Sequence, residues 1–154
     1  MLMLEKWLGQ AQFARALGQF LAKFAYQNPT TDDFLATFEQ ISGKPVTKFM
    51  HQWLEQSGFP LVELRDQTIS QRQFGYDSQQ IWPIPLGAEA TQANLPEVLW
   101  QAEANANQQS CFINRDIVGF MVTNYDETRK NQLRQRLMAG ELDALDQFYY
   151  LSNE

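Results

Sequence analysis

The sequence predicts an α+β protein with N-terminal helices, a small antiparallel β-sandwich and C-terminal helices. Three observations support this class. Residues 1–60 carry apolar side chains at the spacing of one-sided helices. Residues 61–125 hold short apolar runs separated by turn-rich stretches, which is typical of a small sandwich. Residues 126–154 return to the helical period, so we expect domain boundaries near residues 60 and 125.

The first segment begins with two predicted helices. Leu4 and Leu8 share a helical face, and Gly9 interrupts the pattern. The second helix carries a long apolar stripe, formed by Phe13, Leu17, Phe20, Leu21 and Phe24. Asn28-Pro29 ends it, because the residue before a proline avoids the helical region.

Two more helices follow. Residues 30–33 supply a capping hydroxyl and acids for the third helix, and Gly43 suits its C-terminal end. The apolar stripe of this helix consists of Phe34, Phe38 and Ile41. Pro45 lies near the first turn of the fourth helix, which ends at residues 58–60. Its apolar face consists of Val46, Phe49, Met50, Trp53 and Leu54.

The middle segment predicts short strands. Residues 61–65 alternate, and residues 68–74 form a strand with Ile69, Gln71 and Gln73 on one side. Two prolines in residues 81–86 allow only an edge or bulged strand. The other apolar runs are residues 98–100, 111–113 and 119–123. A connection is expected over residues 87–96, and a loop or hairpin end over residues 101–110.

The last segment predicts two helices. Asp126 caps the first, which carries Leu133, Leu137 and Met138 and ends at Gly140. A second, short stripe consists of Leu142, Leu145 and Phe148. No packing partner for this final helix is visible in the sequence, and short isolated helices are marginal in water.

Composition excludes several functional classes. The chain has 154 residues, enough for one domain or two small ones, and 44% of them are hydrophobic. Its net charge of −6 argues against partners such as nucleic acid or an anionic membrane. No apolar run approaches the ~18 residues of a membrane helix. The start lacks the features of a signal peptide, so we expect a cytoplasmic protein.

Single counts of histidine and cysteine limit the chemistry further. With one cysteine, Cys111, the chain has no intrachain disulfide. With one histidine, His51, it has no HExxH zinc site, and His51 is the sole candidate base for a catalytic triad. An enzyme made of this chain alone would work through carboxylates, tyrosines or His51.

Each candidate residue also has a structural interpretation, which we favour. His51 is interpreted as a surface or half-buried helix residue rather than a catalytic or metal-binding one. The adjacent acids Asp32 and Asp33 point in different directions on a helix, so capping is favoured over acid/base chemistry. Cys111 is interpreted as a small buried hydrophobe rather than a nucleophile.

Two larger sets of side chains also suggest binding surfaces. One is a possible sugar- or peptide-binding face of aromatic residues, which we interpret instead as core: Trp53, Trp82, Trp100, Phe74 and Tyr76. The other is a basic helix face, interpreted as solvated or as an interface to absent helices: Arg129, Lys130, Arg134 and Arg136.

An ordered set of motifs resembles zinc aminopeptidases of the aminopeptidase N type, a gluzincin family. Residues 25–34 (AYQNPTTDDF) resemble an AYxNAxT turn, residues 42–46 (SGKPV) an SGKPV turn, and residues 58–62 (GFPLV) a GFP(V/L)V exit. The tryptophan helix of the family corresponds to residues 50–53. Downstream, the LxQxRF and WxIPL strands and the ends of the GFYRVNYD segment are similar to residues 69–74, 82–86, 119–120 and 124–126. Here Val122 replaces an arginine of the family, and Gln147 stands where relatives often have one.

The resemblance implies a fragment of a peptide-trimming enzyme. Residues 1–60 would close a thermolysin-like catalytic domain, residues 61–125 would form its β-sandwich, and residues 126–154 would begin an α-helical domain. The zinc-binding HExxH helix, the substrate-binding GAMEN strand and the oxyanion tyrosine of the family are absent from this sequence. The resemblance therefore assigns no catalytic, substrate-binding or metal residue to this chain, and zinc to the parent only.

The implied role is structural support and linkage between domains, with the missing catalytic and helical domains as partners and peptides as substrates of the parent. Self-association of the fragment is expected, because the stripes of its helices would lack their original cover. Two alternatives remain open at this point: an autonomous peptide- or protein-binding module built on the β-sandwich, and a structural adaptor made of paired helices.

Overall fold

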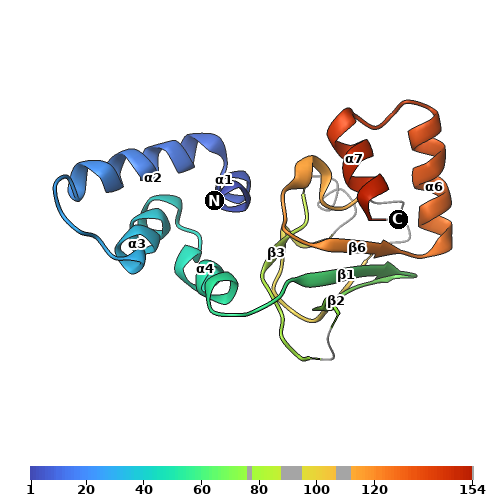
Figure 1. The fold of residues 1–154 in the computed structure, drawn as a ribbon, viewed down its shortest axis with the longest axis horizontal. Coiled ribbons are helices and arrows are strands. Elements are labelled where there is room, and N and C mark those ends of the chain that lie inside the picture. The colour runs from blue at the N-terminus through green and yellow to red at the C-terminus, as the bar shows by residue number, and fades with distance from the viewer. Residues whose placement is uncertain (76–77, 88–94, 107–111, 154) are drawn as a thin grey trace. The chain divides into compact units, whose positions relative to one another are not determined.

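A computed structural model describes residues 1–75, 78–87, 95–106 and 112–153. The chain divides into two compact units, residues 1–57 and 58–154, and each is described by itself. The first unit is helical, and the second combines two sheets with helices (Figure 1). The predicted α+β class is confirmed. Among the described residues, no helix is both long and apolar enough to cross a membrane.

Unit 1 contains the four predicted helices. They are α1 (Leu2–Leu8), α2 (Gln10–Lys23), α3 (Thr31–Ser42) and α4 (Val46–Leu54). Gly9 separates α1 from α2 with a φ of 85°, a conformation that glycine adopts without steric cost. The predicted break at Gly9 is therefore confirmed, whereas α2 ends at Lys23, earlier than the predicted stop at Asn28-Pro29.

The start and end of α3 follow from local chemistry. The Asp33 amide donates to Thr30 Oγ1 at 3.1 Å, and the Thr30 amide donates back to Asp33 Oδ2 at 2.8 Å. This reciprocal pair is a capping box. The hydrogen bonds from the amide and hydroxyl of Thr30 lower the pKa of Asp33. At the other end, Gly43 takes the left-handed conformation with a φ of 68°, as predicted.

The apolar stripes of α2 and α3 cover each other. The ring centroids of Phe13 and Phe38 lie 5.2 Å apart, and those of Phe20 and Phe34 lie 5.1 Å apart. Leu21, predicted in the same stripe, is instead 61% exposed. Between α1 and α4, Trp7 stacks on Phe49 at 4.2 Å. Aromatic packing therefore contributes to the core of unit 1 alongside buried aliphatic side chains such as Leu4, Leu35 and Val46.

The main sheet of unit 2 has the strand order β5-β2-β1-β6. Its strands are β1 (Pro60–Arg65), β2 (Thr68–Gln73), β5 (Glu103–Asn105) and β6 (Val122–Tyr125). β1 pairs antiparallel with β2, and β2 with β5, but β1 and β6 are parallel. The predicted all-antiparallel arrangement is wrong for this pair. The reason is the long connection that leads to β6 through the second sheet, because a parallel pair requires a crossover rather than a hairpin.

The second sheet is a short antiparallel pair, β3 (Ile84–Pro85) and β4 (Val98–Leu99). Gln71 of β2 connects the two sheets from within the core. Its Oε1 accepts from the Trp82 amide at 2.8 Å, and its Nε2 donates to the carbonyls of Trp82 at 2.8 Å and Gln101 at 3.0 Å. The predicted shared side of Ile69, Gln71 and Gln73 is confirmed, since all three are buried.

Three predictions in the middle segment are corrected. Residues 103–105 form a strand where a loop or hairpin end was expected. Phe112 and Ile113 are buried but lie in no strand, and Cys111 lies outside the described residues. β6 begins at Val122, later than expected, because the Asn114 side chain binds both backbone groups of Gly119, accepting from its amide at 2.6 Å and donating to its carbonyl at 3.0 Å.

The two C-terminal helices are α6 (Glu127–Met138) and α7 (Ala144–Ser152). Asp126 caps α6 as predicted, accepting from the Arg129 amide at 2.9 Å. The stripe predicted for α7 is wrong, since Leu145 and Phe148 are 45% and 66% exposed. The buried residues of this helix are instead Asp146, Tyr149 and Tyr150.

The packing partner of α7, invisible in the sequence, is the 3₁₀ turn η1 (Arg115–Ile117) with the start of β6. Asp146 Oδ2 accepts from Arg115 Nε at 2.7 Å, and Oδ1 accepts from the Asp116 amide at 3.1 Å. The Tyr149 hydroxyl donates to the Met121 carbonyl at 3.1 Å. A polar anchor therefore positions this helix, which explains why an apolar period did not reveal it.

Candidate functional site

His51, the single histidine, lies on α4 and contacts two carboxylates. Its Nδ1 is 2.5 Å from Glu55 Oε1, and its Nε2 is 3.0 Å from Asp32 Oδ1 at the start of α3. The hydrogen bond to Glu55 raises the pKa of His51, burial opposes this, and the bond to Asp32 raises it again. The ring is half-buried, as the structural interpretation predicted, but the sequence did not reveal that it bridges two helices.

The adjacent acids Asp32 and Asp33 have separate roles. Asp33 belongs to the capping box, and Asp32 faces His51. The capping interpretation is confirmed for Asp33. The two carboxylates therefore do not form a pair for acid/base chemistry.

The aromatic residues of this set that the structure describes lie in different surroundings. Trp82 is 1% exposed and belongs to the core of unit 2, as the structural interpretation predicted. Phe74 is exposed and stacks on Phe59, with centroids 5.2 Å apart. Trp53 lies in unit 1, Trp100 is half-buried, and Tyr76 lies outside the described residues.

The predicted basic face of α6 separates into individual contacts. Arg129 is buried and turned toward Asp126, so it does not belong to a surface patch. Lys130 pairs with Glu127 at 3.9 Å, and Arg136 with Glu141 at 3.6 Å. Arg134 is exposed and 3.4 Å from Asn131. These contacts favour the solvated interpretation over phosphate binding.

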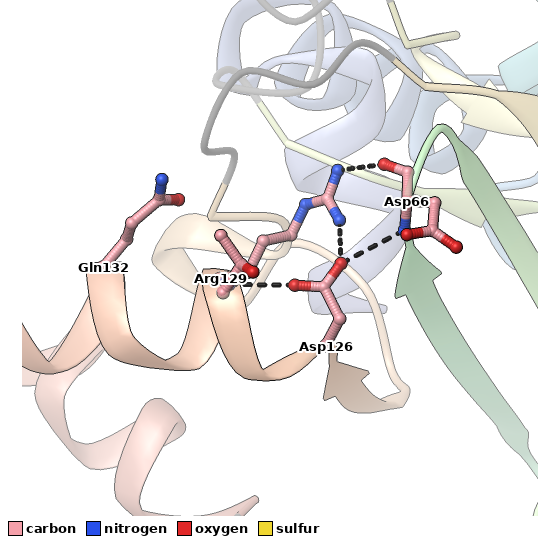
Figure 2. Close-up of a pocket in the computed structure, with 5 residues that line it drawn as sticks. Asp66, Asp126, Arg129 and Gln132 are labelled. Atoms are coloured by element: carbon pink, nitrogen blue, oxygen red, sulfur yellow. Dashed lines mark hydrogen bonds and ion pairs between the residues drawn. The ribbon is translucent and has the colours of Figure 1, made fainter.

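A small polar pocket, with a volume of about 230 Å³, lies at the start of α6 (Figure 2). It is lined by Asp66, Asp126, Thr128, Arg129 and Gln132. The guanidinium of Arg129 forms an ion pair with Asp126 and donates from Nη2 to the Asp66 carbonyl at 2.5 Å. The Asp66 amide in turn donates to Asp126 Oδ2 at 3.1 Å. The pocket therefore surrounds a joint that ties the β1–β2 turn to α6.

The electrostatics of this joint indicate a structural carboxylate. Burial by itself raises the pKa of Asp126, but the hydrogen bonds from the amides of Arg129 and Asp66 and the charge of Arg129 outweigh it and lower the pKa. A carboxylate held in this way is a poor general base. The sequence indicated Asp126 as a cap but gave no sign of the contact with Asp66, 60 residues earlier.

An apolar groove of about 460 Å³ lies along β4 and the start of β5. Its lining consists of Leu95, Pro96, Val98, Leu99, Trp100, Gln101 and Ala104. Among the described residues, this groove is the feature that would best suit the binding surface that the autonomous-module alternative requires.

The similarity of this chain to known proteins begins in its N-terminal helices. The family described as "Peptidase family M1 domain" matches residues 1–53. Aminopeptidase M1-C from Oryza sativa subsp. japonica is 30% identical over 167 residues, covering 94% of this chain and 19% of that relative. Aminopeptidase N from Lactococcus lactis subsp. cremoris is 38% identical over 107 residues, covering 64% and 12%. The chain belongs to the M1 peptidase family. The resemblance inferred from its motifs is confirmed.

This M1 relative spans about a fifth or less of the length of these curated aminopeptidases. The described residues contain no group of three or more His, Cys, Asp or Glu side chains placed to hold a metal ion. The single histidine has both ring nitrogens against carboxylates of an exposed bridge. The residues present therefore do not fit the zinc of the family, whose catalytic site needs three protein ligands and an open position.

Proposed function

We propose that this chain is a non-catalytic fragment of a zinc metallo-aminopeptidase that removes N-terminal residues from peptides, and that it supports and links the domains of that enzyme. The observation that carries the proposal is the extent of the match with the rice relative. It includes 94% of this chain but 19% of the relative. The polar joints at Gln71, Asp126 and Asp146, which hold elements together, agree with a supporting role.

The proposal assigns each of three segments of the chain to a different domain of the parent enzyme. Residues 1–60 would complete the catalytic domain of the parent, residues 61–125 would form a β-sandwich, and residues 126–154 would begin the helical domain. The partners would be those missing domains, with no nucleic acid or membrane contact. Self-association, a cytoplasmic location and the autonomous-module alternative stay predictions.

A chimera tests the supporting role. In the Lactococcus lactis aminopeptidase N, the 107 matched residues would be exchanged for those of this chain. We expect kcat/KM for an aminoacyl-nitroanilide within about tenfold of the parent, or about 1.4 kcal/mol, because a support is needed for its fold and not for its chemistry. A chimera that binds one zinc and melts like the parent, yet is inactive, would contradict the proposal.

The chain by itself is the control for this experiment. We expect no stoichiometric zinc by elemental analysis and no hydrolysis of the same substrate, because the chain does not supply the histidines of the family site. Turnover that a chelator abolishes would overturn the non-catalytic assignment.

A further inference from the structure

The His51 side chain contacts two carboxylates, one close to it in the sequence and one on another helix. Glu55 lies four residues after His51 and belongs to the same end of α4. Asp32 is 19 residues earlier in the chain, in the first turn of α3. α3 and α4 pack against each other (Figure 1). The bond from Nε2 to Asp32 is therefore the one that ties the two helices.

The geometry requires a particular protonation state. A neutral imidazole has one N–H group, whereas the imidazolium has two. An ionised carboxylate accepts hydrogen bonds and donates none. Because both ring nitrogens lie against carboxylate oxygens, at 2.5 and 3.0 Å, only the imidazolium satisfies both contacts. Loss of the proton leaves one carboxylate facing a nitrogen lone pair.

The charged groups around the imidazole ring favour its protonated form. Asp32 from α3 and Glu55 from the end of α4 are the groups whose charges raise the pKa of His51. The carboxylate of Asp33, the neighbour of Asp32, is turned toward Thr30 instead. Glu5 and Lys6 of α1, which packs on α4 through Trp7 and Phe49, are not among the groups that shift it.

We propose that His51 is a pH-dependent clasp, in which the imidazolium holds the start of α3 against the end of α4 and deprotonation releases α3. The direction follows from linkage. A group whose pKa is higher in the folded chain than in the unfolded one stabilises the fold fully below its unfolded value of about 6.5, and that contribution is lost as the pH rises through the folded pKa. The clasp is therefore closed in mildly acidic solution and opens toward alkaline pH.

Two NMR measurements on the full chain test this proposal. Since the chain has one histidine, its imidazole resonances report His51 without assignment. We expect a titration midpoint above 6.5 in the wild type that moves down toward 6.5 in Asp32→Asn and in Glu55→Gln. The matched control Glu5→Gln removes a carboxylate from the same unit and should leave the midpoint unchanged.

The second measurement follows the release itself. After correction for the intrinsic pH dependence of exchange, the hydrogen-exchange protection of the Phe34 and Leu35 amides should fall about two- to fivefold between pH 5.5 and pH 8.5, the size expected for exposed ion pairs. In Asp32→Asn it should stay constant.

A wild-type midpoint at or below 6.5, a midpoint that Asp32→Asn does not move, or protection that is the same at both pH values would each overturn the clasp. None of these outcomes depends on a variant of His51, so a His51→Gln chain that fails to fold leaves the test intact.

Discussion

Replacing Gln71 by leucine is expected to destabilise unit 2 by about 3 kcal/mol or more, since each buried hydrogen-bonding group left unsatisfied costs about 1–3 kcal/mol. The side chain is 6% exposed and forms three hydrogen bonds to the backbone of Trp82 and Gln101. Leucine fills a similar volume but makes none of these bonds. Without these hydrogen bonds, β2 is no longer tied to Trp82 and Gln101, which flank β3 and β4.

Urea unfolding followed through the Trp82 indole resonance measures this effect within unit 2, because Trp82 is buried beside Gln71. Gln79→Leu is the matched control: its side chain is exposed, and we expect a change within about 0.5 kcal/mol. If Gln71→Leu unfolded at the same urea concentration as the wild type, the bonds of Gln71 would not hold the two sheets together.

Replacing Arg115 by methionine is expected to cost about 3 kcal/mol and to detach α7, because it leaves a buried charge without its cation. The Asp146 side chain is 1% exposed, and Arg115 Nε lies 2.7 Å from its Oδ2. Arg115 itself is 32% exposed, so we expect the lower end of the range measured for buried ion pairs. Hydrogen exchange of the α7 amides, together with urea unfolding, reports the loss.

Two further variants separate charge from packing at this anchor. Arg134→Met on α6 changes an exposed arginine and should alter stability by less than about 0.5 kcal/mol. The double variant Arg115→Met with Asp146→Leu removes both charges and should recover part of the loss, since an apolar pair can replace a buried ion pair. Equal losses in the single and double variants would show that shape, not charge, positions α7.

The contacts of Asp146 also help to stabilise an unfavourable backbone conformation in the turn that precedes β6. Asn114, Asp116 and Ile117 all have positive φ angles, which are uncommon outside glycine and least suited to a β-branched residue such as Ile117. Asn114 binds both backbone groups of Gly119, and Asp146 accepts from the Asp116 amide. Contacts from both sides therefore stabilise the turn that η1 occupies.

Sequence reasoning succeeded where neighbours in the chain carry the information. The capping box at Thr30 and Asp33 spans four residues, and the cap at Asp126 acts on the adjacent turn of α6. Gly43 ends α3 through its own backbone conformation. The alternation that placed Gln71 on the same side of β2 as Ile69 is equally local, although it did not say what the buried amide binds. The ordered motifs, read together, also identified the relatives.

Three of the features that sequence reasoning missed share one physical cause. The parallel pairing of β6, the docking of α7 and the bridge at His51 all depend on groups that meet across long stretches of chain: β1 with β6, Arg115 with Asp146 and Asp32 with His51. Periodicity and capping rules describe residues within one or two turns of each other, so they locate helices and strands but not their polar partners. The approximate positions of the helices, two of their caps and the first two strands could therefore be predicted from the amino acids alone. Strand direction, the anchor of the last helix and the carboxylate partners of the single histidine emerged with the folded chain, because specific charged and amide groups meet there only after distant segments pack.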